Sequence, residues 1–174
     1  MRMISQPAHW ERTWSLTCNR LNRRPVISAL FGLVSRLGNG VFWYALMVFL
    51  PLIYGTGALF LVVMMLSCGI LSVILYSLLK RGTHKPRPSA VSGIFRTVEP
   101  LDAFSFPSGH TMHAVGFTWL VVHQHPELGW VLIPFTVLIA ASRLILGLHY
   151  PFDVVVGAVI GAAVAGLHIG VFLP

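Results

Sequence analysis

Charged residues are scarce in this sequence. Asp, Glu, Lys and Arg make up 10% of its 174 residues, whereas soluble globular domains carry about 25%. Hydrophobic residues account for 56% of the chain, and the mean hydropathy is +0.79. This balance excludes an ordinary soluble domain and predicts an integral membrane protein.

Cysteine is almost absent, and the two cysteines form no motif. Cys18 lies in an arginine-rich segment and Cys68 in an apolar run, so they make no CxxC pair. They therefore predict neither a disulfide framework nor a metal site. No histidine cluster has the spacing of metal ligands. Residues 1–25 also lack the apolar core of a cleavable signal peptide. The sequence thus predicts no metal and no other cofactor.

Acidic residues are fewer than basic ones, and the net charge is +7. In a soluble protein this excess would suggest nucleic-acid binding. Here the arginines flank apolar segments, so anionic lipid surfaces and phosphate groups are the better partners. We therefore expect a phosphorylated lipid substrate and a bilayer with anionic lipids, and no nucleic acid.

Residues 1–38 are predicted to form an amphipathic segment at the membrane surface. Four residues recur at near-helical spacing: Trp10, Trp14, Thr17 and Leu21. Tryptophans with nearby arginines are typical of a helix lying in the interface, and a frayed basic tail is the alternative. Residues 26–37 predict an apolar helix too short to span, which Gly38-Asn39-Gly40 ends.

Residues 39–174 are predicted to form a transmembrane domain, so the fold class is an all-α bundle of about five membrane helices. Spans are expected at 41–54, 58–79, 108–122, 130–146 and 152–172. The first is short for a span, which needs about 20 residues. The last has Gly157, Gly161 and Ala165 at four-residue intervals, a pattern that permits close helix contact.

Three polar motifs, at residues 80–88, 105–110 and 142–153, interrupt these apolar segments. Successive spans alternate in direction, so all three motifs are expected at one membrane face. Polar groups at membrane depth are costly, and they usually mark function. The motifs therefore predict one shared site.

The cations of these motifs suit a phosphate group. Lys80, Arg87 and Arg143 would lie together, and guanidinium groups grip phosphate oxygens with two N–H bonds. Ser108 and Gly109 precede a predicted helix, whose free N–H groups form a ready anion site.

The histidines suit displacement at phosphorus. Asp153 follows His149 by four residues, and a carboxylate that accepts one imidazole N–H leaves the other nitrogen free for attack. A capping aspartate beside a structural histidine is the alternative for this pair. His110 is a separate imidazole that could give a proton to a leaving oxygen.

These motifs resemble the three signature motifs of the type 2 phosphatidic acid phosphatase (PAP2) family, in order and in register. The matching stretches are Lys80-x6-Arg87-Pro88, Pro107-Ser108-Gly109-His110 and Ser142-Arg143-x5-His149-x3-Asp153. The resemblance covers residues from about 39 to 172. The family also includes soluble vanadium haloperoxidases, which hold vanadate in the same cradle.

The resemblance implies a role for each matching residue. His149 would be the nucleophile that forms a phosphohistidine, Asp153 would orient it, and His110 would be the acid. Phosphate would be bound, without any metal, by five residues: Lys80, Arg87, Ser108, Gly109 and Arg143. Bacterial members usually have six spans with the motifs facing outward, whereas this chain is predicted to lack the first of these spans.

The leading hypothesis is therefore a metal-independent phosphatase of a lipid phosphomonoester or diphosphate, such as phosphatidate, phosphatidylglycerophosphate, polyprenyl diphosphate or lipid A. The alternatives are a haloperoxidase-like enzyme that uses vanadate and a non-catalytic bundle that binds or transports lipid phosphates. We expect a multi-pass protein of the cell (inner) membrane. All Lys and Arg lie on the side of the motifs, so the positive-inside rule favours a cytoplasmic site, while the family resemblance favours an outward one.

Overall fold

The computed structural model describes residues 7–90, 93–100 and 102–172, and the regular elements in this part of the chain are helices. Its α-helices are α1 (His9–Asn19), α2 (Pro25–Arg36), α3 (Phe42–Tyr54), α4 (Ala58–Thr83), α5 (Gly109–Gln124), α6 (Gly129–Ile145) and α7 (Pro151–Phe172). Shorter helical turns are η1 (Arg20–Arg23), η2 (Leu37–Val41), η3 (Pro88–Ala90) and η4 (Pro126–Leu128). The predicted all-α class is confirmed.

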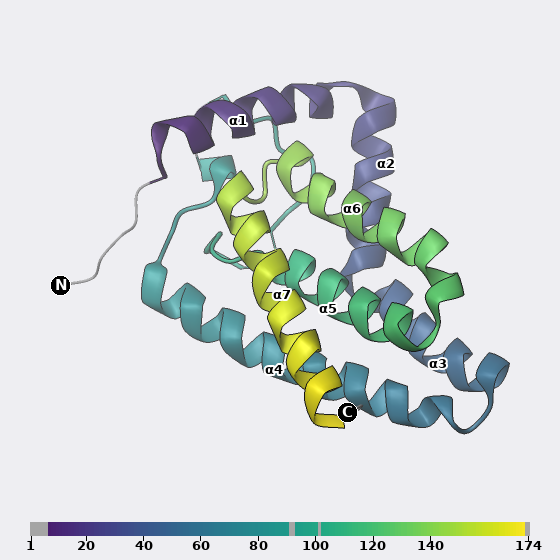
Figure 1. The fold of residues 1–174 in the computed structure, drawn as a ribbon. Coiled ribbons are helices and arrows are strands. Elements are labelled where there is room, and N and C mark those ends of the chain that lie inside the picture. Colours follow the sequence, from purple (N-terminus) through teal and green to yellow (C-terminus); the bar gives the residue numbers. More distant parts are fainter. Residues whose placement is uncertain (1–6, 91–92, 101, 173–174) are drawn as a thin grey trace.

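Four segments of the described chain are long and apolar enough to cross a membrane: Pro25–Tyr54, Ala58–Thr83, Pro126–Ile145 and Pro151–Phe172. The last three agree with the predicted spans at 58–79, 130–146 and 152–172, and the first is longer than the span predicted at 41–54. The remaining one, α5, has 16 residues, about 24 Å of helix at 1.5 Å per residue. Helix α5 lies in the middle of the bundle, surrounded by α4, α6 and α7 (Figure 1).

The first span differs from the prediction. The helix expected to be too short and the span expected at 41–54 form one 30-residue segment, Pro25–Tyr54. Helices α2 and α3 are joined by the π-helical turn η2, where Gly40 has φ 126° and bends the path. Glycine adopts positive φ without steric cost, so helical geometry breaks at Gly40 and the segment resumes as α3 in a new direction. The predicted domain boundary at 38/39 falls inside this turn.

Helices α5 and α7 pack closely because glycines face the partner backbone. A Cβ on Gly157 would collide with the carbonyl of Ser108, and one on Gly161 would collide with that of Met112. The predicted small-residue face of the last span is therefore confirmed. This contact fixes the start of α5 against the start of α7, and both starts carry predicted site residues.

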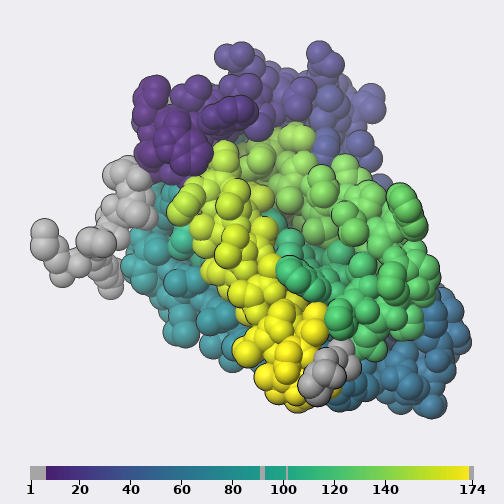
Figure 2. Space-filling view, viewed as in Figure 1, coloured from purple at the N-terminus to yellow at the C-terminus, as the bar shows by residue number. Residues whose placement is uncertain are grey.

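Helix α1 lies across the end of the bundle, over the ends of α6 and α7 (Figure 2). Its Trp10 and Trp14 are exposed, as expected for an interfacial helix. On the inner side, the Asn19 side chain donates to the carbonyls of Phe95 and Ile145 at 3.0 and 2.9 Å. Asn22 also donates to the Phe95 carbonyl at 2.8 Å. Through Asn19 and Asn22, α1 and η1 therefore also hold the 93–100 loop and the end of α6 in place.

Candidate phosphate-binding site

The three polar motifs meet at the end of the bundle that α1 covers. Helix α4 ends at Thr83, and His84 turns the chain with φ 49°. The following loop folds back so that Ser105 N–H donates to the Lys85 carbonyl at 2.9 Å. This pairing brings the first motif beside the second.

Arg87 lies at the centre of the site. Its Nη1 donates to the Leu148 carbonyl at 2.7 Å and lies 3.2 Å from Nε2 of His149. Its Nε donates to the Asp102 carbonyl and its Nη2 to the Asp102 carboxylate, both at 2.8 Å. Burial lowers the pKa of Arg87 below its usual value, and Asp102 opposes that shift. Arg87 is therefore a buried cation facing the reactive nitrogen of His149.

Asp102 is a site residue that the sequence did not reveal. Its carboxylate also pairs with Nζ of Lys80 at 2.5 Å. Burial raises the pKa of Asp102, but Lys80 and Arg87 lower it by more, so the net pKa is below the usual value. An ionised carboxylate thus bridges two of the predicted phosphate-binding cations.

The start of α5 forms the second wall of the site. Ser108 is the N-cap, and its side chain accepts from Thr111 N–H. The Ser108 N–H donates to the Asp153 carbonyl at 3.0 Å. Gly109 and His110 begin α5, and N–H groups in the first turn of a helix have no intrahelical partners. A Cβ on Gly109 would lie 3.1 Å from the Tyr76 ring, so glycine suits this tight contact with α4.

Arg143 supplies the third cation from the last turn of α6. It is 2% exposed, and its Nε and Nη2 lie 3.0 and 2.9 Å from Oγ of Ser142. Arg143 lines a small cavity of about 20 Å³ together with Arg87 and His149. The sequence motif is therefore assembled as expected, with Ser142 holding the guanidinium.

His149 is oriented differently from the expectation. Its Nδ1 donates to the Ser105 carbonyl at 2.6 Å, whereas the Asp153 carboxylate lies 3.8 Å from the same atom. Asp153 instead accepts from Tyr150 N–H at 2.9 Å. Burial lowers the pKa of His149 to about 4, so the ring is neutral near pH 7. The backbone carbonyl fixes the tautomer and leaves the lone pair on Nε2.

Asp153 has a second partner that sequence reasoning missed. The Lys85 Nζ donates to Asp153 Oδ1 at 2.9 Å and to Glu11 Oε1 at 2.7 Å, and all three side chains are buried. A lysine in a polar, basic loop is usually a solvated surface cation, whereas Lys85 is buried. Its position between Lys80 and Arg87 gave no signal, because the partner Glu11 lies on α1, far away in sequence.

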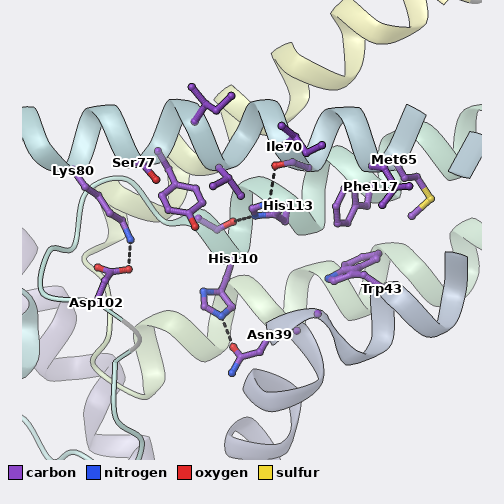
Figure 3. Close-up of a pocket in the computed structure, with 18 of the residues that line it drawn as sticks. Asn39, Trp43, Met65, Ile70, Ser77, Lys80, Asp102, His110, His113 and Phe117 are labelled. Carbon is purple, nitrogen blue, oxygen red and sulfur yellow. Dashed lines mark hydrogen bonds and ion pairs between the residues drawn. The ribbon is translucent and has the colours of Figure 1, made fainter. Parts of the chain in front are cut away.

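His110 hydrogen-bonds Asn39 of the η2 turn through Nε2 (Figure 3). Beside it, a cavity of about 860 Å³ runs between α3 and α4. Its apolar lining includes Trp43, Met65 and Ile70, and His113 and Phe117 of α5 lie at its inner side (Figure 3). We call this cavity the α3–α4 groove. Lys80 lines it at the polar end.

In the described residues, no three His, Cys, Asp or Glu side chains are grouped so as to hold a metal ion. The positive charge of the site comes from Lys80, Arg87 and Arg143. The arrangement can hold a tetrahedral oxyanion between these cations and the start of α5, with an imidazole nitrogen beside it.

The fold defines a multi-pass membrane protein, with a cluster of buried cations and histidines at one end of its helical bundle. The family model described as the PAP2 superfamily matches residues 56–172, and the chain belongs to this superfamily.

Three known proteins are similar to this chain. The chain is 30% identical over 98 residues to undecaprenyl-diphosphatase BcrC of Bacillus subtilis (strain 168), and the match covers 56% of this chain but only 50% of that protein. The crystal structure of Aquifex aeolicus LpxE has a TM-score of 0.82 and 25% identity, over 97% of this chain and 99% of that one.

A PAP2-type phosphatidylglycerolphosphate phosphatase from Bacillus subtilis has a TM-score of 0.74 and 25% identity, over 93% of this chain and 84% of that one. The similarity to both solved structures includes nearly the whole chain, so it extends well beyond residues 56–172 of the family model.

Proposed function

We propose that this protein is a membrane lipid phosphatase that hydrolyses a lipid phosphomonoester or diphosphate without a metal ion. The observation that carries the proposal is the junction of a cationic cradle with the α3–α4 groove of about 860 Å³. A phosphate group would bind among Lys80, Arg87 and Arg143. The attached chain would lie in the groove, against Trp43 and Met65.

The length of the groove favours a lipid over a small soluble phosphate. Along α4 its lining extends from Lys80 to Met65, which is about 22 Å at 1.5 Å per residue. Apolar side chains of α3 form the facing wall. Such walls match the apolar interior of the bilayer, so a lipid chain can enter the groove without exposing apolar surface to water.

The chemistry follows from the two histidines. Nε2 of His149 attacks phosphorus, and a P–N bond forms as the P–O bond to the lipid breaks. The electron pair goes to the leaving oxygen, which takes a proton from His110. Water then attacks the phosphohistidine, gives a proton to His110 and releases inorganic phosphate. The three cations stabilise the charge that develops on the phosphoryl oxygens.

The relatives support a lipid substrate but leave its identity open. By their names, one acts on undecaprenyl diphosphate and another on phosphatidylglycerol phosphate. Both are phosphorylated lipids with the headgroup chemistry that this cradle suits. The membrane spans and the apolar groove argue against a haloperoxidase.

We further propose that the site faces the cytoplasm. Exposed arginines of α1 and η1 (Arg12, Arg20 and Arg23) lie at the same end of the bundle as the site. At the opposite end, the turns at 55–57 and 125–128 contain no Lys or Arg. The positive-inside rule places the arginine-rich end in the cytoplasm.

The central experiment measures phosphate release from a panel of lipid phosphates by the protein purified in detergent. His149→Ala should abolish release, whereas His123→Ala, an exposed histidine at the opposite end, should retain it. Radiolabelled substrate should give an acid-labile, base-stable label in wild type and none in His149→Ala. Retained activity in His149→Ala would refute the nucleophile, and binding without release by wild type would support a non-catalytic bundle.

A second measurement separates binding from chemistry. Arg87→Ala and Arg143→Ala should both weaken inhibition by vanadate, which mimics the transition state. His110→Ala should lower the rate but keep vanadate inhibition. Chelators should leave wild type active, and loss of activity in EDTA that added metal restores would refute the metal-free cradle.

A further inference from the structure

Asn39 joins the two cavities of the site. The small cavity beside Arg143 and His149 and the α3–α4 groove have two described lining residues in common, Asn39 and His110. These two side chains are hydrogen-bonded to each other (Figure 3). The boundary between the phosphate-binding cavity and the lipid-binding groove is therefore this one contact.

The kink of the first span places Asn39 there. Gly38 packs so closely on α6 that a Cβ would lie 3.1 Å from Ile139, and Gly40 takes φ 126°. These two glycines let the turn approach the core and direct the Asn39 amide toward the start of α5. An amide within a spanning segment is costly unless it has a polar partner, and His110 is that partner.

The hydrogen bond leaves one nitrogen of His110 for chemistry. Asn39 Oδ1 lies against Nε2, where it can accept an N–H. Nδ1 of His110 has no hydrogen-bond partner among residues 7–90, 93–100 and 102–172. An acceptor on one imidazole nitrogen fixes the ring orientation and the tautomer, and the other nitrogen can then exchange a proton.

We propose that Asn39 is a positioning residue that holds His110 for protonation of the lipid leaving group. This inference rests on the proposed phosphatase function. With phosphate in the small cavity and the lipid in the groove, the P–O bond that breaks lies at their boundary, beside His110. Nδ1–H of the imidazolium gives its proton to the leaving oxygen, and the neutral ring keeps its hydrogen on Nε2, donated to Asn39.

Leaving groups differ in their need for this proton, and the difference gives the test. An alkyl phosphate releases a basic alkoxide that needs the acid, whereas a nitrophenyl phosphate releases a stable phenolate that does not. Phosphate release from both substrates would be measured for wild type, Asn39→Leu, Asn39→Asp and Gly32→Ala. Gly32 lies in α2, and a Cβ added there meets no atom within 4 Å, so this control should match wild type.

Asn39→Leu should lower kcat for the alkyl phosphate by about 10- to 100-fold, a share of the 10²–10⁴ that a general acid contributes. Its kcat for the nitrophenyl phosphate should stay close to wild type, and vanadate should still inhibit. His110→Ala should show the same selective loss, and combining it with Asn39→Leu should add little. Asn39→Asp keeps the acceptor oxygen and should keep the wild-type ratio of the two rates.

Two results would overturn the inference. One is an equal loss on both substrates in Asn39→Leu, which is what a merely structural role predicts. The other is a rate ratio in Asn39→Asp as altered as that of Asn39→Leu. Failure of the phosphatase proposal looks different, because wild type would then hydrolyse neither substrate.

Discussion

Lys85 offers the sharpest test of how α1 is attached to the site. It is the shared partner of two buried carboxylates, Glu11 of α1 and Asp153 of α7. The exposed fractions of the three side chains are 6%, 6% and 0% for Lys85, Glu11 and Asp153. Removing one partner of such a pair costs about 3–5 kcal/mol, because a buried charge is left uncompensated. Lys85→Met should therefore lose about this much stability.

Glu11→Gln tests whether the loss in Lys85→Met comes from an unpaired buried charge or only from lost contacts. The two explanations predict opposite changes in stability when both substitutions are combined. Glu11→Gln alone should destabilise, by about 1.5–3 kcal/mol for a hydrogen bond to a charged group. In the Lys85→Met background the same change removes a bare carboxylate, so the double variant should be more stable than Lys85→Met. Independent contacts would instead give additive losses.

Unfolding in mixed detergent micelles, followed by circular dichroism, measures these free energies. Arg81→Met is the matched control, because Arg81 is an exposed cation near the end of α4, and it should change stability by less than about 0.5 kcal/mol. The reasoning is wrong if Lys85→Met behaves like Arg81→Met, or if Glu11→Gln destabilises the Lys85→Met variant further.

Three other predictions address pH, packing and orientation. The pKa of His149 is about 4 in the folded protein against 6.5 ordinarily, so this group should cost wild type up to about 3 kcal/mol of stability as pH falls from 6.5 to 4. Unfolding measured across that range should show a slope smaller by this amount for His149→Asn. Gly161→Ala should cost about 1–3 kcal/mol by overpacking α5, whereas Gly166→Ala, where the added Cβ meets no atom within 4 Å, should be neutral in the same assay. In a version without native cysteines, Arg96→Cys and His123→Cys would be treated with an impermeant thiol reagent in intact cells. Position 96 should stay unlabelled and position 123 should react. The reverse pattern would place the site outward.

The motif residues were predictable because their spacing and the parity of the spans are properties of the chain. Lys80, Ser108 and His149 follow or precede apolar segments that must alternate across a bilayer, so they had to meet at one face. The glycine spacing of the last span likewise predicted its close contact with α5. The all-α class followed from composition alone, since a backbone in lipid must satisfy its hydrogen bonds within helices or closed barrels.

The first span shows where sequence reasoning was insufficient. Gly38 and Gly40 lower helix propensity, and their sequence predicts a stop. Helical geometry does break there, at Gly40 with φ 126°. The chain resumes at once as α3, so the two helices form one 30-residue apolar segment, and the turn between them packs on α6. Asn39 becomes a site residue only because of that packing.

The sequence by itself determined the class of fold, the residues of the three motifs and the fact that all three meet at one end of the bundle. The tertiary structure decided which groups are hydrogen-bonded to the motif residues. Ser105 bonds His149, Asp102 bonds Lys80 and Arg87, Lys85 bonds Asp153, and Asn39 bonds His110. Periodicity and spacing act within one segment and can be counted along the chain. Hydrogen bonds between segments far apart in sequence depend on loop paths and helix kinks, which form only when the whole bundle packs.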